Sequence, residues 1–420
     1  MAIDPYWFII SASLIIIVSY LFTIIASRTS IPSVLLLIFT GFLIRQGLQL
    51  MGFGEISLLP ILEVLGIIGL ILIVLEASLD LKLEKSKWPM IVKSFILALV
   101  ILLVTSFACA YIIYFFLGID YYTSLIYAVP ISIMSSAIII PSVTNLVDEK
   151  REFMIYESTF SDILGIIMFY ILIDTDPTQN SNFYSIPLEA ILNIALTVII
   201  AVIVSFSIIL LLQRITSRMK LFLSFAILLL IYSIGKLMHL SSLIIILIFG
   251  LILNNREIFV RGILKKKIKR RFLLRILNDF KFITSETAFL IRTFFFVIFG
   301  MSIAVSTLNN VIIYEISILL LIALYLIRYF NMKWVLGAKV FPELYIAPRG
   351  LITILLFFSI PEELMASDFE SGILLLVILS TNVIMMVALM ITGNKLDAIA
   401  DRVEEPTFPA NMTPGVKSLD

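Results

Sequence analysis

The stretch FMIYESTFSDILGIIMFY, residues 153–170, decides the fold and the function that this sequence predicts. It is apolar and long enough for a membrane-spanning helix, yet it contains two carboxylic acids, Glu157 and Asp162. An ionised carboxylate at the centre of a bilayer costs about 3 kcal/mol or more. Two acids kept in such a segment, beside Ser158 and Ser161, therefore indicate a functional site inside the membrane.

Helical spacing separates the two acids. Ser158 and Asp162 are four residues apart and lie on one face of a helix, whereas Glu157 and Ser161 share an adjacent face. The acids therefore point in different directions. One can be held by a structural partner while the other faces water and a transported ion.

Composition places the chain among polytopic membrane proteins. Hydrophobic residues make up 61% of the 420 residues and charged residues only 14%, with a mean hydropathy of +1.13, whereas soluble proteins contain about 25% charged residues. The apolar run at the N-terminus lacks the basic region of a signal peptide, so we expect a retained first span.

The same composition excludes several chemistries. The single cysteine, Cys109, allows no intrachain disulfide, and the single histidine, His239, excludes a His-rich zinc site. The sequence has no P-loop motif, which argues against direct drive by ATP. We therefore expect neither a cofactor nor an enzymatic activity.

Apolar segments of about 17 residues or more are candidate spanning helices, and they predict an all-α protein with thirteen spans. The expected spans are 6–26, 31–49, 58–79, 89–117, 121–147, 152–174, 187–213, 220–236, 240–254, 282–305, 311–338, 343–360 and 371–392. Most lysines and arginines between spans fall in the odd-numbered loops, whereas the charged residues of the other loops are mainly acids. This pattern places the N-terminus outside and the C-terminus in the cytoplasm.

Thirteen spans divide as six, one and six, which predicts two six-helix inverted repeats of the kind found in secondary transporters. The repeats match spans five and twelve. Span five contains Pro130 and Pro141 around a run of small polar residues, and span twelve contains residues 347–350 (APRG). Proline in a helix interior removes a backbone hydrogen bond, so we expect spans five and twelve to be two broken helices that cross. The alternative is that each span is a continuous helix with an ordinary proline kink.

One loop has an unusual composition. Residues 256–275, from Arg256 to Arg275, carry nine basic residues among isoleucine, leucine and phenylalanine. The pattern suits a helix lying on anionic membrane lipids, or a solvated loop that only enforces topology. Nothing else in the sequence supports nucleic-acid binding.

Four more charged residues fall at membrane depth: Glu76, Arg292, Arg328 and Arg349. Arg349 lies in the predicted break of span twelve and requires a carboxylate partner, for which Glu157 and Glu76 are the candidates. We assign Glu76, Glu157 and Arg349 a structural role, and we interpret the other two arginines as structural counter-charges. Asp162 is then left for a cation from solution.

These residues resemble a known family. The pattern Glu157-Ser158-x-x-Ser161-Asp162 is similar to the Glu-Ser-x-x-Asn-Asp signature of the monovalent cation:proton antiporters, which include prokaryotic sodium/proton antiporters and animal sodium/hydrogen exchangers. Four further stretches agree: 75–80 (LEASLD), 135–137 (SSA), 294–301 (FFFVIFGM) and 348–350 (PRG).

The resemblance implies a role for each matching residue. Asp162 is the shared site of the cation and the proton, with oxygen ligands from Ser158, Ser161, Ser135 and Ser136. Glu157 and Arg349 form a scaffold ion pair, and Glu76 is the third member of that cluster. The expected cargo is Na⁺, with K⁺ or Li⁺ as alternatives, in exchange for H⁺.

The resemblance also implies a domain organisation and an assembly. Residues 1–88 and 181–310 are expected to form dimerisation and linker helices, 89–180 and 311–394 the transport core, and 395–420 a cytoplasmic tail. A homodimer in a prokaryotic plasma membrane is expected.

Two departures from the family pattern bear on mechanism. Ser161 stands where the family has asparagine or, in an electrogenic branch, a second aspartate, so one cation per proton is expected. The usual Thr-Asp-Pro of span five is absent, which leaves the ligands and the preference between Na⁺ and K⁺ open.

Asp162 also has interpretations outside antiport. It could be a buried acid that only supports helix packing. An intramembrane aspartyl protease requires two facing aspartates, and Asp162 is the one clear aspartate at mid-membrane. A symporter of organic anions with sodium should use cationic groups for its substrate, and an ion channel would not respond to a counter-gradient of protons. A lone central carboxylate favours cation antiport.

Overall fold

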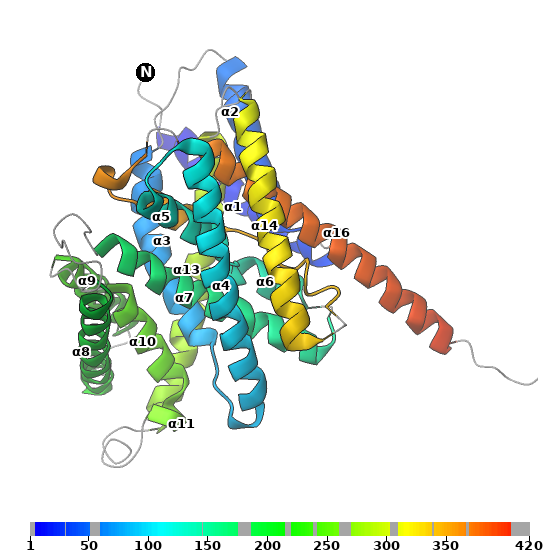
Figure 1. The fold of residues 1–420 in the computed structure, drawn as a ribbon. Coiled ribbons are helices and arrows are strands. Elements are labelled where there is room, and N and C mark those ends of the chain that lie inside the picture. The colour runs from blue at the N-terminus through cyan, green and yellow to red at the C-terminus, as the bar shows by residue number, and fades with distance from the viewer. Residues whose placement is uncertain are drawn as a thin grey trace, which may run out of the picture.

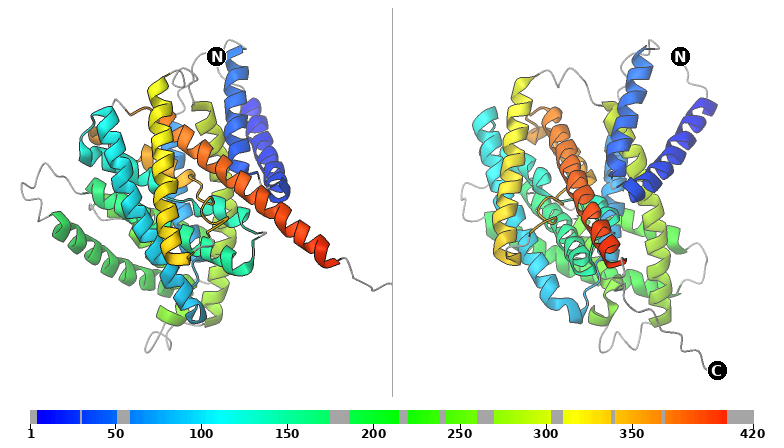
Figure 2. Two further views of the ribbon diagram at one scale, coloured as in Figure 1. Left: turned by 45° about the vertical axis from the view of Figure 1, so that its right-hand side comes forward. Right: turned by 90° about the vertical axis from the view of Figure 1, so that its right-hand side faces the viewer.

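The computed structural model describes residues 5–29, 31–50, 59–144, 146–174, 186–214, 220–237, 242–259, 270–302, 310–337, 340–366 and 369–404. The regular secondary structure of these parts is helical, without a strand. The arrangement is shown in Figures 1 and 2. The prediction of an all-α protein is confirmed.

Every predicted span corresponds to at least one helix. Those of the first half are α1 (Pro5–Thr29), α2 (Ser33–Leu50), α3 (Leu59–Asp80), α4 (Trp88–Leu117), α5 (Tyr121–Ser132), α6 (Ser136–Ser142) and α7 (Asp148–Asp174). Those of the second half are α8 (Ile186–Arg214), α9 (Lys220–Leu237), α10 (Ser242–Asn254), α13 (Arg270–Ser302), α14 (Val311–Leu336), α15 (Leu351–Phe358) and α16 (Ser371–Glu404). Within the described residues, nine helical segments are long and apolar enough to cross a membrane on their own. The four predicted spans not among them correspond to α3, α9, α10 and α15.

The helices pack as two groups. In the crossing bundle, α4 packs against α5, α7 and α14, α14 packs against α16, and α15 packs against α5. In the outer bundle, α13 packs against α2 and α3, and α10 packs against α3, α8 and α9. Contacts of α3 with α15 and α7, and of α1 with α6, join the two bundles. Figure 2 shows the long α16 passing diagonally across the crossing bundle.

An extended segment connects α3 of the outer bundle to α4 of the crossing bundle. Asn255, at the end of α10, accepts a hydrogen bond from the Leu83 N–H (2.6 Å) and donates one to the Leu81 carbonyl (2.8 Å). The Tyr156 hydroxyl of α7 donates to the Lys82 carbonyl (2.9 Å). The segment is therefore held from both bundles, and its backbone groups are satisfied without a helix.

The predicted break in span five is confirmed. α5 ends at Ser132, α6 begins at Ser136, and the backbone between them is extended. Ser135 donates its backbone N–H to the Pro348 carbonyl (2.9 Å), so the interruption in span five touches the one in span twelve. We call these two segments, residues 133–135 and 346–350, the crossing.

The predicted break in span twelve is also confirmed, but the part of span 343–360 that precedes the break is not helical. Turns occupy residues 341–345, residues 346–350 have no regular secondary structure, and α15 is the helical part of the span. Two prolines, Pro342 and Pro348, account for this because each lacks an N–H and disfavours a helical residue before it. The carbonyls left free here are used by arginine side chains.

Two predicted boundaries change or lie outside the described residues. α16 continues to Glu404, well into the predicted tail that begins at 395. Of the basic segment 256–275, the structure describes α11 (Arg256–Phe259) and the start of α13, while residues 260–269 lie outside the described part. His239 also lies outside it.

Candidate functional site

Asp162 lies on α7, fully buried with 1% of its surface exposed. Its Oδ2 atom accepts a hydrogen bond from the Ser136 N–H (3.0 Å). Its Oδ1 atom is also buried and has no hydrogen-bond partner among the described residues. Buried carboxylate oxygens almost always have a partner, so this oxygen is unusual. An open oxygen of this kind suits a ligand from solution, either a proton or a cation.

The break in span five exposes backbone N–H groups that no helix can satisfy. Three polar atoms accept them: Ser161 Oγ from Met134 (3.0 Å), the Pro348 carbonyl from Ser135, and Asp162 Oδ2 from Ser136. Hydrocarbon offers no hydrogen-bond acceptors, so these three acceptors are what allow a broken helix at membrane depth. Ser161 and Asp162, which are successive residues of α7, therefore both accept backbone N–H groups from the break.

The predicted serine ligands divide into two sets. Ser135 lies at the crossing with its hydroxyl buried and without a partner in the described part of the chain, and Ser136 reaches Asp162 through its backbone. Ser158 instead donates its hydroxyl to the Ile155 carbonyl of its own helix (3.2 Å). The structure thus brings Asp162, Ser161, Ser135 and Ser136 together at the break, whereas the Ser158 hydroxyl is occupied within α7.

Two glycines permit the close approach of the crossing to its neighbours. A Cβ atom on Gly165 would lie 2.3 Å from the Ile133 side chain. A Cβ atom on Gly350 would lie 2.6 Å from Ile138 and 2.7 Å from Ser135 Oγ. A side chain at either position would push the break away from α7 or from span twelve.

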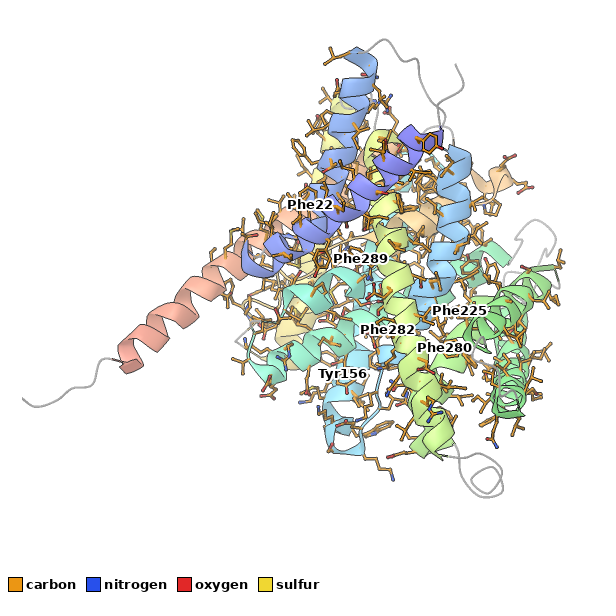
Figure 3. The ribbon with its side chains drawn as sticks, turned by 180° about the vertical axis from the view of Figure 1, so that it is seen from behind. Phe22, Tyr156, Phe225, Phe280, Phe282 and Phe289 are labelled. Atoms are coloured by element: carbon orange, nitrogen blue, oxygen red, sulfur yellow. The ribbon has the colours of Figure 1, made fainter. Side chains whose placement is uncertain are left out.

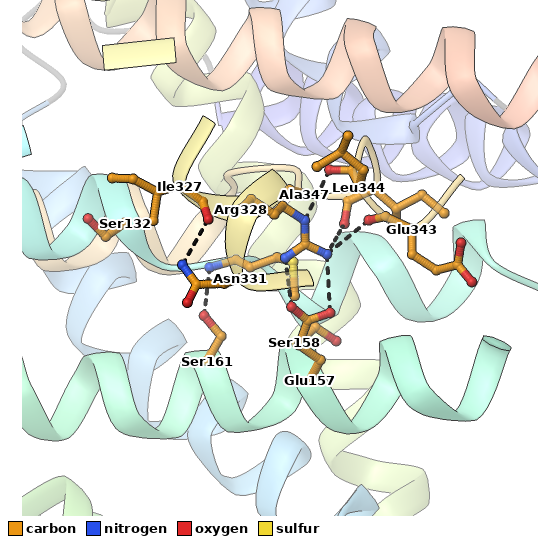
Figure 4. Close-up of polar contacts among 12 residues, drawn as sticks. Ser132, Glu157, Ser158, Ser161, Ile327, Arg328, Asn331, Glu343, Leu344 and Ala347 are labelled. Carbon is orange, nitrogen blue, oxygen red and sulfur yellow. Dashed lines mark hydrogen bonds and ion pairs between the residues drawn. The ribbon is translucent and has the colours of Figure 1, made fainter. Parts of the chain in front are cut away.

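The ion pair of Glu157 is formed with Arg328 of α14, not with Arg349 as the sequence suggested. Arg328 binds both carboxylate oxygens, with Nη1–Oε1 at 2.6 Å and Nη2–Oε2 at 3.1 Å, as Figure 4 shows. Its remaining donors reach the carbonyls of Leu344 (3.0 Å), Glu343 (2.9 Å) and Ile346 (3.4 Å). Arg328 therefore fastens the non-helical part of span twelve to α7, with both partners of the pair buried.

Arg349 binds backbone carbonyls instead of a carboxylate. Its Nε donates to Ile131 (2.9 Å), its Nη1 to Ala347 (2.5 Å) and its Nη2 to Ser132 (3.3 Å). Ile131 and Ser132 are the last residues of α5, whose final carbonyls lack helical partners and carry partial negative charge. A guanidinium at this helix end is stabilised without a counter-ion of its own, which is why the predicted pair was wrong.

Glu76 is also placed differently from the prediction. It lies on α3 in the outer bundle and pairs with Arg292 of α13, with Nη1 and Oε2 3.0 Å apart. It does not join Glu157 and Arg349. Arg292 and Arg328 each pair with a glutamate, as expected of counter-charges.

Sequence reasoning missed two residues of α16 that hold the crossing. Thr381 Oγ1 accepts the Arg349 N–H (3.1 Å), and Asn382 Nδ2 donates to the Arg349 carbonyl (2.8 Å). The signal available in sequence was their polarity, since Thr381 and Asn382 interrupt a long apolar run. Polar side chains within a span usually face a neighbouring helix.

A small cavity of about 10 Å³ lies beside these groups, lined by Ser132, Met134, Glu157, Ser161, Arg328 and Arg349, among others. This volume corresponds to about one water molecule. In the described residues, no group of three or more histidine, cysteine or acidic side chains is arranged to hold a metal ion. The site is therefore built from one open carboxylate, hydroxyls and backbone groups.

Comparison with known proteins decides the family. The sequence model of "Sodium/hydrogen exchanger, transmembrane" matches residues 13–392, most of the chain. The chain belongs to the sodium/hydrogen exchanger family. It is an integral membrane transporter, and the resemblance seen in the sequence is confirmed.

Solved structures show the same fold. A structure of the sodium proton antiporter MjNhaP1 from Methanocaldococcus jannaschii at pH 8 aligns with a TM-score of 0.66 at 19% identity, covering 95% of this chain and 99% of that one. An electron microscopy structure of the same antiporter aligns with a TM-score of 0.64 at 18% identity, covering 97% and 100%. No curated protein matches the exchanger in sequence.

Proposed function

We propose that this exchanger is a secondary active antiporter that moves a monovalent cation, Na⁺ first and K⁺ or Li⁺ as alternatives, against H⁺. The cation and the proton compete for Asp162. The observation that carries this proposal is the buried Oδ1 atom of Asp162, which has no partner in the described residues while Oδ2 is held by the Ser136 N–H. Membership of the sodium/hydrogen exchanger family supports the same cargo.

The chemistry requires one group with two mutually exclusive ligands. A buried carboxylate is costly when ionised and unpaired, so Asp162 is stabilised by either a proton or a cation. Carboxylate, hydroxyl and carbonyl oxygens suit hard cations, and the Ser135 hydroxyl is available at the crossing. If only the neutralised site passes from one side of the membrane to the other, exchange is obligatory.

The charge balance supports one cation per proton. The negative charge of Glu157 is matched by Arg328, with both carboxylate oxygens engaged. Ser161 carries no charge. Among the described residues at the crossing and on α7 beside it, Asp162 then remains as the carboxylate whose charge changes during transport, and exchange is electroneutral.

Access changes sides by movement of one bundle against the other. The crossing bundle carries Asp162, the broken helices and both buried arginines, and it meets the outer bundle through a smaller set of helix contacts. We assign the transport core to residues 89–180 and 311–394. Residues 1–88 and 181–310 form the static part and the surface of a homodimer in a prokaryotic plasma membrane, with the N-terminus outside.

The test is cation-driven proton movement in proteoliposomes. We expect the wild type to alter the internal pH when Na⁺, K⁺ or Li⁺ is added outside, without generating a membrane potential, and Asp162→Asn to be inactive. Activity in Asp162→Asn would show that the acid is structural. A wild type that exchanges none of the three cations would contradict the proposed function, and organic-anion uptake would be measured next.

A further inference from the structure

The ion pair of Glu76 and Arg292 lies away from the crossing, between α3 and α13 of the outer bundle. Unlike the Glu157–Arg328 pair, it is partly open to solvent, with 19% of the Glu76 side chain and 23% of the Arg292 side chain exposed. One hydrogen bond of 3.0 Å joins the two, from Arg292 Nη1 to Glu76 Oε2. The pair is therefore accessible and held by a single hydrogen bond. A partly exposed pair of this kind contributes little to stability, so a purely structural role does not account for it well.

Each member of this pair lines a different cavity. The first cavity, about 320 Å³, is lined by Glu76, Asp80 and Lys281 together with Thr284 and Ser285 of α13. The second, about 210 Å³, is lined by Arg292 and Thr293 together with residues of α1, α2 and α6. Figure 3 labels Phe282 of the first cavity and Phe289 of the second at successive levels along α13. Because Glu76 lines the first cavity and Arg292 the second, the ion pair stands where the two cavities approach each other.

The second cavity leads toward the ion site. Ala137 and Ile138 of α6 line it, and they follow directly on Ser136, whose N–H binds Asp162. The cavity lies between α1, α2 and α13 of the outer bundle and α6 of the crossing bundle. An ion that passes from the first cavity to the second would therefore arrive on the α6 side of the Asp162 site.

We propose that the Glu76–Arg292 pair is a gate between the two cavities, and that Arg292 acts as a tethered cation that competes with the transported cation for this passage. The inference rests on the proposed function. Arg292 does not touch the cargo at Asp162; it sets how readily a cation reaches it.

The proposal predicts opposite effects for the two members of one ion pair. Arg292→Gln removes the competing positive charge and leaves Glu76 to attract cations, so the KM for the cation should fall about fivefold. Glu76→Gln leaves an unpaired positive charge in the passage, so the KM should rise by a similar factor. The maximal rate at saturating cation should change little, because Asp162 and the crossing are untouched. A purely structural pair would instead give the same defect with either substitution.

The experiment measures KM and maximal rate of cation-driven proton movement in proteoliposomes for wild type, Arg292→Gln, Glu76→Gln, the double variant and Arg292→Lys. Lys333→Gln, an exposed cation on α14 over the Tyr329 ring, serves as a matched loss of one positive charge. We expect KM values below wild type for Arg292→Gln and above it for Glu76→Gln. The double variant should lie between the two single variants, with Arg292→Lys and Lys333→Gln near wild type.

Equal KM values in wild type and Arg292→Gln, or a shift in the same direction for both single variants, would overturn the gate. So would a shift in Lys333→Gln as large as in Arg292→Gln, because it would reflect net charge alone. If Arg292→Gln proves too unstable to purify, the double variant, which leaves no unpaired charge, still tests the idea through its KM relative to Glu76→Gln. Absence of exchange in the wild type would contradict the proposed function itself, which keeps the two failures distinct.

Discussion

Glu157 and Asp162 occupy the same helix, five residues apart, and both are 1% exposed, yet their surroundings differ completely. Both oxygens of Glu157 bind the guanidinium of Arg328, which in turn binds three backbone carbonyls. Asp162 has one oxygen on a neutral N–H and the other open. A buried acid whose oxygens all have charged or polar partners is fixed in place. A buried acid with an unpartnered oxygen can bind a proton or a cation from solution.

The comparison also shows how the fixed acid, Glu157, supports the arrangement around Asp162. Arg328 and Glu157 anchor the turns before α15 to α7, and Arg349 anchors the end of α5 to span twelve. These links set the crossing against α7 at the height of Asp162. The fixed pair thus positions the break that leaves Asp162 half satisfied.

The largest expected contrast is in transport. Asp162→Asn should abolish exchange, at least about 100-fold below wild type, because a neutral amide neither takes up nor releases a proton near neutral pH and has no negative charge to offset that of a cation. It should still fold, since the amide oxygen can accept the Ser136 N–H. Proton movement in proteoliposomes measures the loss, and size-exclusion profiles in detergent check the fold. A correctly folded variant with wild-type rates would remove the distinction between the two acids.

The next contrast is in stability. Arg328→Gln leaves Glu157 buried without its cation and should destabilise the protein by about 3–5 kcal/mol. The double variant Glu157→Gln/Arg328→Gln should recover part of this loss because no unpaired charge remains. Asp162→Asn should leave the thermal unfolding midpoint in detergent unchanged or raise it. Equal losses for Arg328→Gln and Asp162→Asn would show that both acids are structural.

A smaller effect is expected where α7 touches the break. Gly165→Ala places a methyl group against the Ile133 side chain, at 2.3 Å, and overpacking of this kind costs about 1–3 kcal/mol. Because the shift moves the break relative to Asp162, the exchange rate should fall as well. Gly47→Ala is the control, since nothing lies within 4 Å of a Cβ atom there. A tolerated Gly165→Ala would mean that the break is looser than the packing indicates.

Ser161→Ala should have a lesser effect than Gly165→Ala. It removes the acceptor of the Met134 N–H, and a lost buried hydrogen bond costs about 1 kcal/mol. Exchange should remain electroneutral, since no charge changes. Thermal unfolding and the voltage dependence of exchange measure the two effects, and Ser158→Ala, whose hydroxyl binds only its own helix, is the matched control.

The smallest effect is expected for an exposed pair outside the spans. The hydrogen bond from Lys82 to Glu84 (2.5 Å) lowers the pKa of the Glu84 carboxyl below its ordinary value of 4.5. A lowered pKa stabilises the fold at pH values above the unfolded pKa, and this contribution is lost as pH falls through the folded pKa. The contribution of this pair is therefore constant near neutral pH, and it is small because both side chains are exposed and screened by water. Glu84→Gln should leave thermal unfolding at pH 7 unchanged. A marked effect would mean that the linker ahead of α4 is more tightly coupled than its exposure suggests.

Sequence patterns were sufficient for the elements of this fold but not for its long-range pairs. The acids of α7, the break around Ser135 and the interruption at Pro348 all follow from local signals: polarity in apolar runs and proline in spans. The choice between Arg328 and Arg349 as the partner of Glu157 does not, because it depends on how the chain folds back over more than a hundred residues. The sequence pointed to Arg349 on the assumption that a buried guanidinium needs a carboxylate. The free carbonyls of α5 met that need instead.

Span twelve, predicted over 343–360 with a break at 347–350, has no helix before that break for a related reason. Its composition is apolar enough for a span, and a single sequence gives no view of the arginine donors that satisfy its backbone. Arg328 binds the carbonyls of Glu343, Leu344 and Ile346, which makes non-helical backbone stable at this depth. Glu76 was misplaced in the same way, since its partner Arg292 is 216 residues distant in sequence.

The central claim, that a cation and a proton compete for Asp162, is tested most directly by counting protons released when the cation binds. Calorimetric titration of the purified exchanger with Na⁺, K⁺ or Li⁺ in two buffers of different ionisation enthalpy gives this number. At a pH where the site is protonated, the account predicts about one proton released for each cation bound by the wild type, and neither binding nor release by Asp162→Asn. Cation binding without proton release, or unchanged release in Asp162→Asn, would contradict it.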